Sequence, residues 1–555
     1  MSSPDSSTRL SPTESVPTQV IPSPVPSLSD TVIGLNGAPE KHDKTSLPVE
    51  EPLNQQKVEA ERPMKLSQRK KWSLLAVFSL GFFVDVWSYS AFFIFTGPIS
   101  ESLDILFEQQ TWVITSYAVT FAAFLLLWGR VSDLWSAKPV FSYGFIVLGI
   151  LDLIISFLPD KYSFFVLRAI SGIAGATLIP ASFRLIVAVF EPHELGKAFT
   201  LYGMSGALAN TTGIIIAGFV EYIPNGGQGE AWRWFFRILA ILIMPFAIGS
   251  LYFIPTPKGA IAQADDKWKR LDIVGTFSML AGIVLLILGL TLGASYGWKK
   301  AGFLAPFLIA WVLIVFFFFW EARLSDECAI LPSKTWRIPN FAVLITLGLF
   351  IYGWWSVNFL PFVEIFVRVH NERAIIAAVR MLPQGIAAGV VTVVLTLYPK
   401  LTSNPRWPIS VGLIGGAIGL ILFTQSEGDV VGSGYWRWVF TGGAIGSSGV
   451  MIAFTGTNVG VMTSVPPEMA GVAGAVLQVS LQVGSAVALS IQSGLLTINP
   501  GNLENFSNVK ASWYFELGWT LLWLVGFLVF YRPGKRPVSS AEDGAEQGER
   551  PIMAH

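Results

Sequence analysis

The chain has 555 residues, of which 52% are hydrophobic and only 13% are charged, whereas average soluble chains carry roughly 25% charged residues. This composition excludes an ordinary soluble globular protein and a wholly disordered chain. The 37 Lys and Arg residues balance the 37 Asp and Glu residues, so the charge gives no reason to expect nucleic acid as a partner. A single Cys allows no intrachain disulfide, and four scattered His do not form a metal site. We therefore expect neither a metal nor a cofactor.

The two ends of the chain differ in composition from the rest. Residues 1–64 are rich in Ser, Pro, Thr and Glu and have no periodic apolar pattern, so they cannot bury enough apolar surface to fold. They also lack the positive start and apolar core of a secretory signal. Residues 533–555 have a similar composition. We predict that both segments are disordered tails.

Between the tails, apolar runs follow one another, each about as long as the ~20 residues that cross a bilayer. They are too long for strands of a membrane β-barrel and do not alternate with period two, so the predicted fold class is an all-α polytopic membrane protein. Fourteen transmembrane helices are expected, and thirteen is the main alternative because the twelfth and thirteenth runs are rich in Gly, Ser and Thr. The runs are 72–98, 110–128, 139–159, 162–190, 197–221, 233–254, 272–293, 301–320, 339–363, 374–397, 408–425, 435–462, 469–496 and 511–531.

The connections between these runs predict the orientation and the organisation of the chain. With the amino terminus inside, beside Arg69 and its neighbours, the inner connections carry more Lys and Arg than the outer ones. Asn505 then falls in the last outer connection, in a sequon where glycosylation can occur. The seventh and eighth runs are nearly free of charge and are expected to face lipid. The prediction is a six-helix half over 65–255, a cytoplasmic loop with an inserted helix pair over 256–337, and a second six-helix half over 338–532.

Charged residues inside predicted spans are energetically expensive, so each one is a candidate functional residue. Asp85 lies in the middle of the first span, Asp152 midway along the third and Arg168 in the fourth. A carboxyl group in apolar surroundings can exchange a proton near physiological pH, and a neighbouring Arg changes how readily it does so. We therefore predict that these three residues couple transport to protons, with Asp85 as the leading carrier and a pairing with Arg168 within side-chain reach. A purely structural hydrogen bond is the alternative, above all for Asp152.

Two further patterns lie beside these spans. In the inner connection between the second and third spans stand Gly129, Asp133 and Lys138, which an ordinary charged loop would also explain. Small or polar residues line the fifth span, where they allow helices to pack closely: Gly206, Asn210, Gly213 and Gly218.

These residues carry a resemblance to the major facilitator superfamily. The inner connection resembles the G-x-x-x-D-R-x-G-R-[RK] signature of that family at Gly129, Asp133 and Lys138, but it lacks the signature's Arg, Gly and Arg. Arg168-x-x-Ser171-Gly172 resembles the R-x-x-Q-G motif, whose Arg is implicated in proton transfer in the family. The similarity runs over about 65–532.

The fifth span resembles the antiporter motif G-x-x-x-G-P-x-x-G-G at Gly213 and Gly218, with Ile214 in place of Pro and Ala217 in place of Gly. Tight packing alone would also explain it. The stretches at 232–236 and 271–275 are similar to the fourteen-span drug:proton antiporter branch. Fungal members of that branch include aminotriazole-resistance and low-affinity ammonium transporters.

The resemblance implies the major facilitator fold, in which two six-helix halves surround a central cavity near the bilayer midplane. With an inserted helix pair, the ninth and twelfth spans would border the cavity in the second half. Polar and aromatic side chains expected at the substrate cavity are Tyr89, Trp354, Asn358, Thr455, Asn458, Gln478 and Gln482. Interhelical hydrogen bonds would equally explain the amides, and packing would explain the tryptophans.

The resulting prediction is a secondary active transporter that exports a small organic or xenobiotic compound in exchange for protons by alternating access. Its partners would be the substrate, protons and the lipid bilayer, and it would work as a monomer, in the plasma membrane rather than the vacuole, with both termini cytoplasmic. The main alternative is a facilitator of a small solute such as ammonium or borate. A non-transporting sensor would need a long structured tail, and a membrane-embedded enzyme would need a reactive cluster, which the scattered His and the lone Cys328 do not provide.

Overall fold

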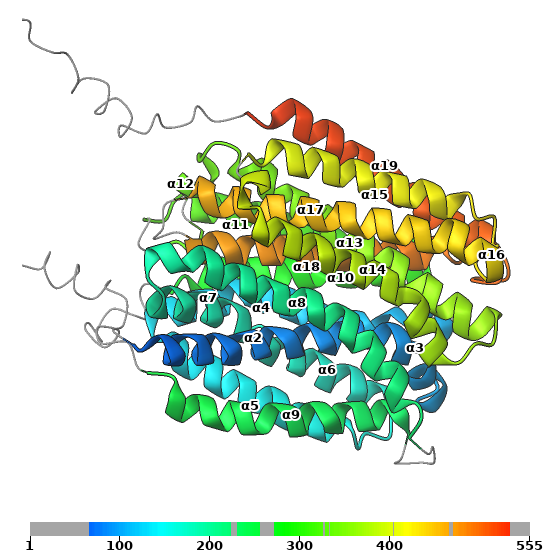
Figure 1. The fold of residues 1–555 in the computed structure, drawn as a ribbon, viewed down its shortest axis with the longest axis horizontal. Coiled ribbons are helices and arrows are strands. Elements are labelled where there is room, and N and C mark those ends of the chain that lie inside the picture. The colour runs from blue at the N-terminus through cyan, green and yellow to red at the C-terminus, as the bar shows by residue number, and fades with distance from the viewer. Residues whose placement is uncertain are drawn as a thin grey trace, which may run out of the picture. The chain divides into compact units, whose positions relative to one another are not determined.

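The computed structural model describes residues 66–223, 230–255, 271–325, 328–331, 333–402, 404–465 and 470–532, and within these ranges it contains helices and no β-strand. Fourteen of the helical segments are long and apolar enough to cross a membrane, which confirms the predicted number and supports neither thirteen spans nor a β-barrel. The predicted tails, 1–64 and 533–555, lie outside the described residues. Figure 1 shows the described helices as a bundle.

The first six spans occupy residues 68–253. Two of them are broken: the first consists of α2 and α3, separated at Ala91, and the fourth of α6 and α7, separated at Ala176 and Thr177. The second break has a covalent cause, because Pro180 has no N–H to donate to the carbonyl of Ala176. The helices are α2 (Gln68–Ser90), α3 (Phe92–Ser102), α4 (Thr111–Leu134), α5 (Ala137–Ile155), α6 (Lys161–Gly175), α7 (Leu178–Val189), α8 (Pro192–Val220) and α9 (Ala231–Phe253).

The seventh and eighth spans, α10 (Ile273–Tyr296) and α11 (Ala301–Glu321), pack against each other as a pair. A Cβ on Gly289 would lie 3.0 Å from the backbone nitrogen of Phe307, so glycine permits this close approach. Only Ala310, Phe317 and Glu321 of α11 are buried. An apolar helix with so much exposed surface suits contact with lipid, as its composition predicts. The short helix α12 (Ser333–Trp336) follows the pair.

The last six spans occupy residues 341–530, and two of them contain a π-helical turn. The twelfth and thirteenth runs, which seemed weak because of their small residues, form helices whose glycines permit close contact. A Cβ on Gly449 would lie 2.7 Å from the backbone oxygen of Gly412, and one on Gly484 would lie 2.4 Å from that of Leu349. The elements are α13 (Phe341–Glu364), η3 (Ile365–Val369), α14 (Ala374–Leu397), η4 (Pro399–Thr402), α15 (Arg406–Thr424), α16 (Gly432–Gly434), η5 (Tyr435–Phe440), α17 (Thr441–Ser464), α18 (Ala470–Leu495) and α19 (Phe506–Phe530).

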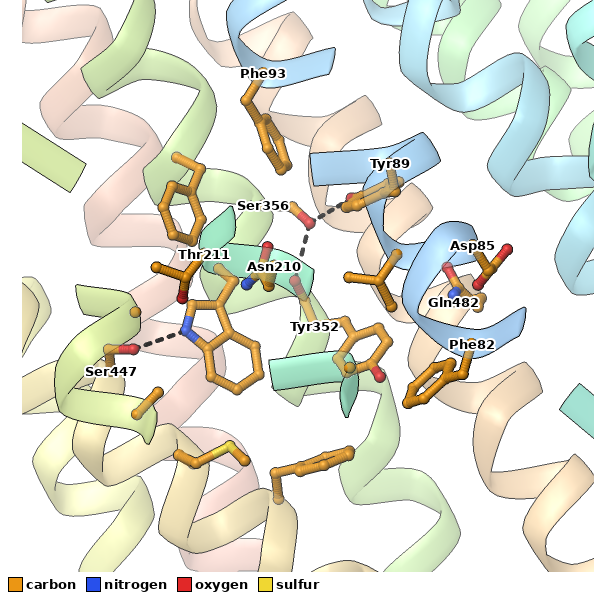
Figure 2. A pocket seen from close by; sticks show the side chains of 18 of the residues that line it. Phe82, Asp85, Tyr89, Phe93, Asn210, Thr211, Tyr352, Ser356, Ser447 and Gln482 are labelled. Carbon is orange, nitrogen blue, oxygen red and sulfur yellow. Dashed lines mark hydrogen bonds between the residues drawn. The ribbon is translucent and has the colours of Figure 1, made fainter. Parts of the chain in front are cut away.

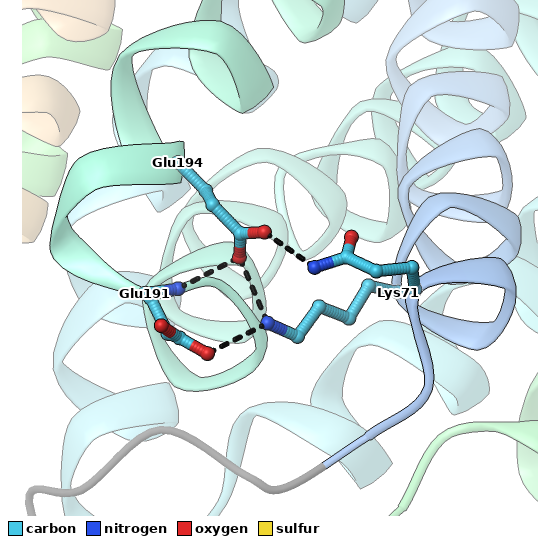
Figure 3. A network of polar contacts seen from close by, with 4 residues as sticks. Lys71, Glu191 and Glu194 are labelled. Atoms are coloured by element: carbon cyan, nitrogen blue, oxygen red, sulfur yellow. Dashed lines mark hydrogen bonds and ion pairs between the residues drawn. The ribbon is translucent and has the colours of Figure 1, made fainter.

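The start of α2 and the end of α19 lie at the same end of the bundle (Figure 1). Lys71 Nζ at the start of α2 lies 3.2 Å from Glu191 Oε1 and 2.8 Å from Glu194 Oε2, beside the start of α8 (Figure 3). At the end of α19, the backbone N–H of Arg532 donates to Asn340 Oδ1, just before α13, at 2.8 Å. The first, fifth and ninth spans therefore begin at the end of the bundle where the last span finishes, as an even number of crossings requires.

Candidate functional site

A central cavity of about 100 Å³ lies between the first and the last six spans. Its lining comes from α2, α3, α4 and α8 on one side and from α13, α14, α17 and α18 on the other. Aromatic rings form much of the wall, including Phe82, Phe93, Tyr352, Trp355, Phe359 and Phe454. Figure 2 shows Asp85 and Gln482 on one side of the view and Thr211 and Ser447 on the other. The cavity is thus an aromatic chamber with a few polar groups, as is typical of small-molecule sites.

Asp85 is the carboxylate of this chamber and is only 4% exposed. The hydroxyl of Tyr117, on α4, donates to Asp85 Oδ1 at 2.5 Å. A Cβ on Gly175 would lie 2.1 Å from that hydroxyl oxygen, so only glycine at this position of α6 leaves room for the bond. A buried carboxylate needs such a partner because it has lost its hydration.

Arg168, on α6, is fully buried near Asp85. Its Nη2 donates to the carbonyl of Ser88 at 2.9 Å, and its guanidinium lies 4.0 Å from the ring centre of Phe92 and 4.7 Å from that of Tyr117. The predicted direct pairing is absent, because no ion pair joins Arg168 to Asp85 within the described part of the chain. Tyr117 connects them instead, with its hydroxyl on the carboxylate and its ring against the guanidinium.

Asp152, on α5, is fully buried and does not line the cavity. Neither carboxylate oxygen has a hydrogen-bond partner among the described residues. The structural hydrogen bond considered as an alternative for this residue is therefore not present.

Tyr89 links the two groups of spans at the cavity wall. Its hydroxyl lies 2.6 Å from Ser356 Oγ on α13 and 2.6 Å from Ser485 Oγ on α18, and the two serine oxygens lie 2.7 Å apart (Figure 2 shows Tyr89 and Ser356). One turn further along the first span, the ring of Phe93 stacks on that of Phe359 with centroids 5.6 Å apart. The first and last six spans are thus in direct contact on this side of the cavity.

Of the residues predicted at the substrate cavity, Tyr89 and Gln482 line it. Trp354 lies outside the lining and is fully buried, with its indole N–H donating to the carbonyl of Gly416 at 3.2 Å. The neighbouring Trp355 faces the cavity and donates to Ser447 Oγ at 3.0 Å. Successive residues of a helix point about 100° apart, so only one of two adjacent tryptophans can face the chamber.

The remaining predicted amides and hydroxyls are also absent from the lining. Three of them bond to the carbonyl four residues earlier in their own helix: Asn358 to Trp354, Thr455 to Met451 and Asn458 to Phe454. Gln478 is buried in α18. Cavity contacts are instead made by other residues of these helices, among them Ser356 and Met451.

A family model described as Major Facilitator Superfamily matches residues 78–367. The chain belongs to the major facilitator superfamily. Among its relatives are a major facilitator superfamily multidrug transporter, mfsC, of Aspergillus fumigatus (26% identical, covering 82% of this chain and 86% of the relative) and the puromycin resistance protein pur8 of Streptomyces alboniger (26%, 77% and 82%). A low affinity ammonium transporter of Saccharomyces cerevisiae is 23% identical over 74% of this chain and 78% of the relative.

Solved structures of the superfamily share the fold. A peptide transporter in complex with sulfate superposes with a TM-score of 0.60 at 13% identity, covering 85% of this chain and 98% of that one. A D-xylose-proton symporter gives 0.59 at 12% identity, with 83% and 98% covered. The protein is therefore a multi-pass integral membrane transporter of this superfamily, and it binds a small-molecule substrate.

In this transporter, two of the antiporter-like residues of α8 line the cavity and two pack against neighbouring helices. Gly206 and Asn210 line the cavity. Gly213 packs against the first span, since a Cβ there would lie 2.1 Å from Ser90 Oγ. Gly218 packs against the tenth span, where a Cβ would lie 2.9 Å from the Cα of Ile375. The stripe therefore joins α2 to α8 and α8 to α14.

The predicted gating loop of the transporter is largely helical, because α4 extends to Leu134 and α5 begins at Ala137. Gly129 lies in α4, where an added Cβ would be 3.6 Å from Pro180 Cβ on α7 and 3.9 Å from Ala475 Cβ on α18. Lys138 is the second residue of α5. The side chain of Asp133 lies outside the described residues.

Asn505 caps α19 and accepts from the backbone N–H of Ser507 at 3.2 Å. The helix begins at Phe506, five residues earlier than the predicted span, so the sequon lies directly at a helix start. Its glycosylation stays a prediction. No group of three or more potential metal ligands occurs in the described part of the chain.

Two buried residues near the cavity or its helices were overlooked by sequence reasoning. Tyr117 carries no charge, and one tyrosine in an aromatic-rich span gives no signal that it bonds to Asp85. Glu516, on α19, is fully buried, and neither of its carboxylate oxygens has a partner among the described residues. A carboxylate inside a predicted span was a sufficient signal, and the same rule that selected Asp85 identifies Glu516.

Proposed function

We propose that this transporter exports a small organic compound in exchange for protons. The observation that carries the proposal is the place of Asp85: apart from tyrosines, it is the one ionisable side chain among the described residues that line the cavity. Ionised Asp85 adds a single negative charge to an aromatic chamber, and protonated Asp85 removes it. Because aromatic rings form much of the chamber wall, that change alters the binding of any substrate held there.

Tyr117 and Arg168 are proposed to tune this proton exchange. The Tyr117 hydroxyl favours the ionised carboxylate by donating to it. Arg168 lies against the same tyrosine ring, so a movement of α6 changes the charge and the hydrogen bonding around Asp85 together. Asp152 is proposed as a second acidic partner of Arg168, since it is buried and without another hydrogen-bond partner.

Alternating access requires the two groups of spans to separate on one side at a time. We propose that residues 65–255 and 338–532 move as these two halves, with residues 256–337 carrying the inserted pair. The Tyr89 hydroxyl cluster and the Phe93–Phe359 stack are the contacts that part when the outer side opens. The cavity lies between the two halves of one chain, and we propose that the transporter works as a monomer.

The orientation proposed here places both termini in the cytoplasm and the transporter in the plasma membrane. It is supported by the Lys and Arg bias of the connections and by the shared end of α2 and α19 (Figure 1). The relatives whose names describe multidrug transport and puromycin resistance support export of an organic compound.

A facilitator of a small solute is the second candidate. The relative described as a low affinity ammonium transporter and the absence of the antiporter motif's proline, at Ile214, favour it. A facilitator shares the cavity but moves its solute without protein-dependent proton movement.

Reconstituted liposomes with a trapped pH dye separate the two candidates. Puromycin and methylammonium are added in turn, and luminal pH and solute flux are recorded for the native protein and for Asp85→Asn. Asp104→Asn is the matched control, since Asp104 is exposed and lies outside the spans. Proton exchange is expected with a transported solute in the native protein and the control but not in Asp85→Asn. Equal solute flux without proton movement in all three proteins would overturn the proposal in favour of the facilitator.

A further inference from the structure

The fifth and tenth spans meet at the end of the bundle where α8 finishes and α14 begins. There the helices touch backbone to backbone, as shown by the 2.9 Å between a Cβ built on Gly218 and the Cα of Ile375. One turn beyond Gly218, Glu221 directly follows α8 and its Oε2 accepts from the backbone N–H of Ala374 at 3.2 Å. Ala374 is the first residue of α14.

This bond is a helix cap supplied from the opposite half. The first N–H groups of a helix have no partner within it, and the positive end of the helix dipole attracts an anion. Arg373, which stands at the N-cap position of α14, provides no capping side-chain bond of its own. A residue of the first six spans therefore satisfies a group that the last six spans leave open, and the bond breaks when the two halves separate here.

We propose that Glu221 is a proton-responsive latch on the outer side of the transporter, where binding of an external proton favours the closed form. The outer position follows from the orientation under the proposed function, on which this inference rests. In an antiporter such a latch has a clear use: a proton arriving from outside helps to close the outer side and to return the cavity to the cytoplasm.

The sign of the effect follows from burial. Desolvation between α8 and α14 raises the pKa of the Glu221 carboxyl above its ordinary value, and the Ala374 N–H offsets part of that increase. Opening returns the carboxyl to water and removes the increase. The closed form therefore binds a proton more tightly than the open form, so a fall in external pH shifts the equilibrium toward closure.

Two other charged pairs among the described residues at this end each lie within one half. Glu372 pairs with Arg380, and both belong to the last six spans, so this pair does not have to break when the halves part. Glu230 and Arg233 likewise pair within the first six spans. The charged groups on the elements packed against this end of α8 are Arg373, Glu372 and Arg380 near α14, Glu101 on α3, and Glu230 and Arg233 at α9.

A second contact between the halves lies near the same end. Gln110, before α4, can accept from both terminal nitrogens of Arg368 on η3, at 3.1 and 3.2 Å. Glu364 Oε2 lies 2.5 Å from Arg368 Nε. This contact does not involve Glu221, so variants of Glu221 keep a second contact between the halves at this end.

The test measures outward opening directly. Ala388, which lines the cavity, is replaced by Cys in a Cys328→Ser background, and intact cells are treated with a membrane-impermeant maleimide at external pH 5.5 to 8. Because the thiolate is the species that reacts and its fraction falls with pH, each rate is divided by that of an exposed cysteine, Asp104→Cys in the same background, at the same pH. This relative labelling rate of the parent is expected to fall as the external pH falls. Glu221→Gln keeps the acceptor without the charge, so it should be labelled slowly at every pH. Glu221→Ala removes the acceptor and should be labelled about five-fold faster, the shift that corresponds to loss of a typical helix cap.

Glu372→Gln is the matched control and should retain the pH dependence of the parent. The proposal is overturned if Glu221→Gln keeps the full pH dependence, if Gln and Ala variants are labelled alike, or if the pH dependence is lost with Glu372. Labelling requires neither substrate nor proton flux. It can therefore be interpreted even if the liposome experiment shows that the protein is a facilitator. Failure of the latch would likewise leave proton exchange at Asp85 untouched.

Discussion

Replacing Gly206 by Ala tests whether the antiporter-like residues of α8 serve mainly to let neighbouring helices pack closely. A Cβ on Gly206 would lie 2.4 Å from Cε1 of Phe82 on α2. That ring is stacked on Tyr202 with centroids 4.9 Å apart and planes 11° apart, so a shift away from the methyl group would disturb this stack. By contrast, a Cβ on Gly203, one turn away on the same helix, meets nothing within 4 Å.

The pair of variants separates overpacking from helix propensity. Ala is better than Gly in a helix by about 1 kcal/mol, and both variants gain this. Forcing a methyl group into a closely packed site costs about 1–3 kcal/mol, and only Gly206→Ala carries that cost. The free energy of unfolding of Gly206→Ala should therefore fall about 1–3 kcal/mol below that of Gly203→Ala.

The assay is thermal unfolding of the detergent-solubilised protein, followed by the loss of its monodisperse chromatographic peak. The expected order of midpoints is Gly203→Ala at or above the native protein and Gly206→Ala below it. Phe82→Leu should restore part of the loss in the double variant, since it removes the ring that the methyl group meets. If Gly206→Ala is as stable as Gly203→Ala, or if Phe82→Leu gives no rescue, the packing argument is wrong.

Three further predictions follow from particular contacts. Trp355→Ala should weaken substrate binding, whereas Trp354→Ala should lower the free energy of unfolding by about 3–5 kcal/mol, because only Trp355 lines the cavity; a reversed pattern in binding and melting assays would refute this. The hydrogen bond from Lys71 lowers the pKa of Glu194 from 4.5 to about 2 (Figure 3). Ionised Glu194 therefore stabilises the fold above about pH 4.5, and this contribution disappears toward pH 2. In Glu194→Gln the melting temperature should depend less on pH over that interval than in the native protein. An equal pH dependence in both proteins would contradict this. Deglycosylation should increase the electrophoretic mobility of the protein expressed in a fungal host, and Asn505→Gln should abolish that change; mobility that enzyme treatment does not alter would place no glycan at Asn505.

Hydropathy was sufficient to predict how many times the chain crosses the membrane. A span is recognised from the residues within it, because every one of its backbone groups bonds inside the helix and its side chains must suit lipid. The same local reasoning selected Asp85, since a carboxylate in the middle of an apolar run is costly wherever it points. The same rule also selects Glu516, a buried carboxylate inside the last span.

The sequence by itself therefore determined the all-helical membrane fold, its fourteen spans and the acid in the cavity wall. Only the tertiary structure decided which face of each helix borders that cavity, as Trp355 rather than Trp354 shows, and which partner Asp85 finds, namely Tyr117 rather than Arg168. The physical reason is that lipid and protein interior are both apolar, so a membrane helix carries little contrast between its faces. Its rotation is set by close contacts of small residues with neighbouring helices, such as Gly206 against Phe82 and Gly218 against Ile375, and those neighbours are distant in the chain.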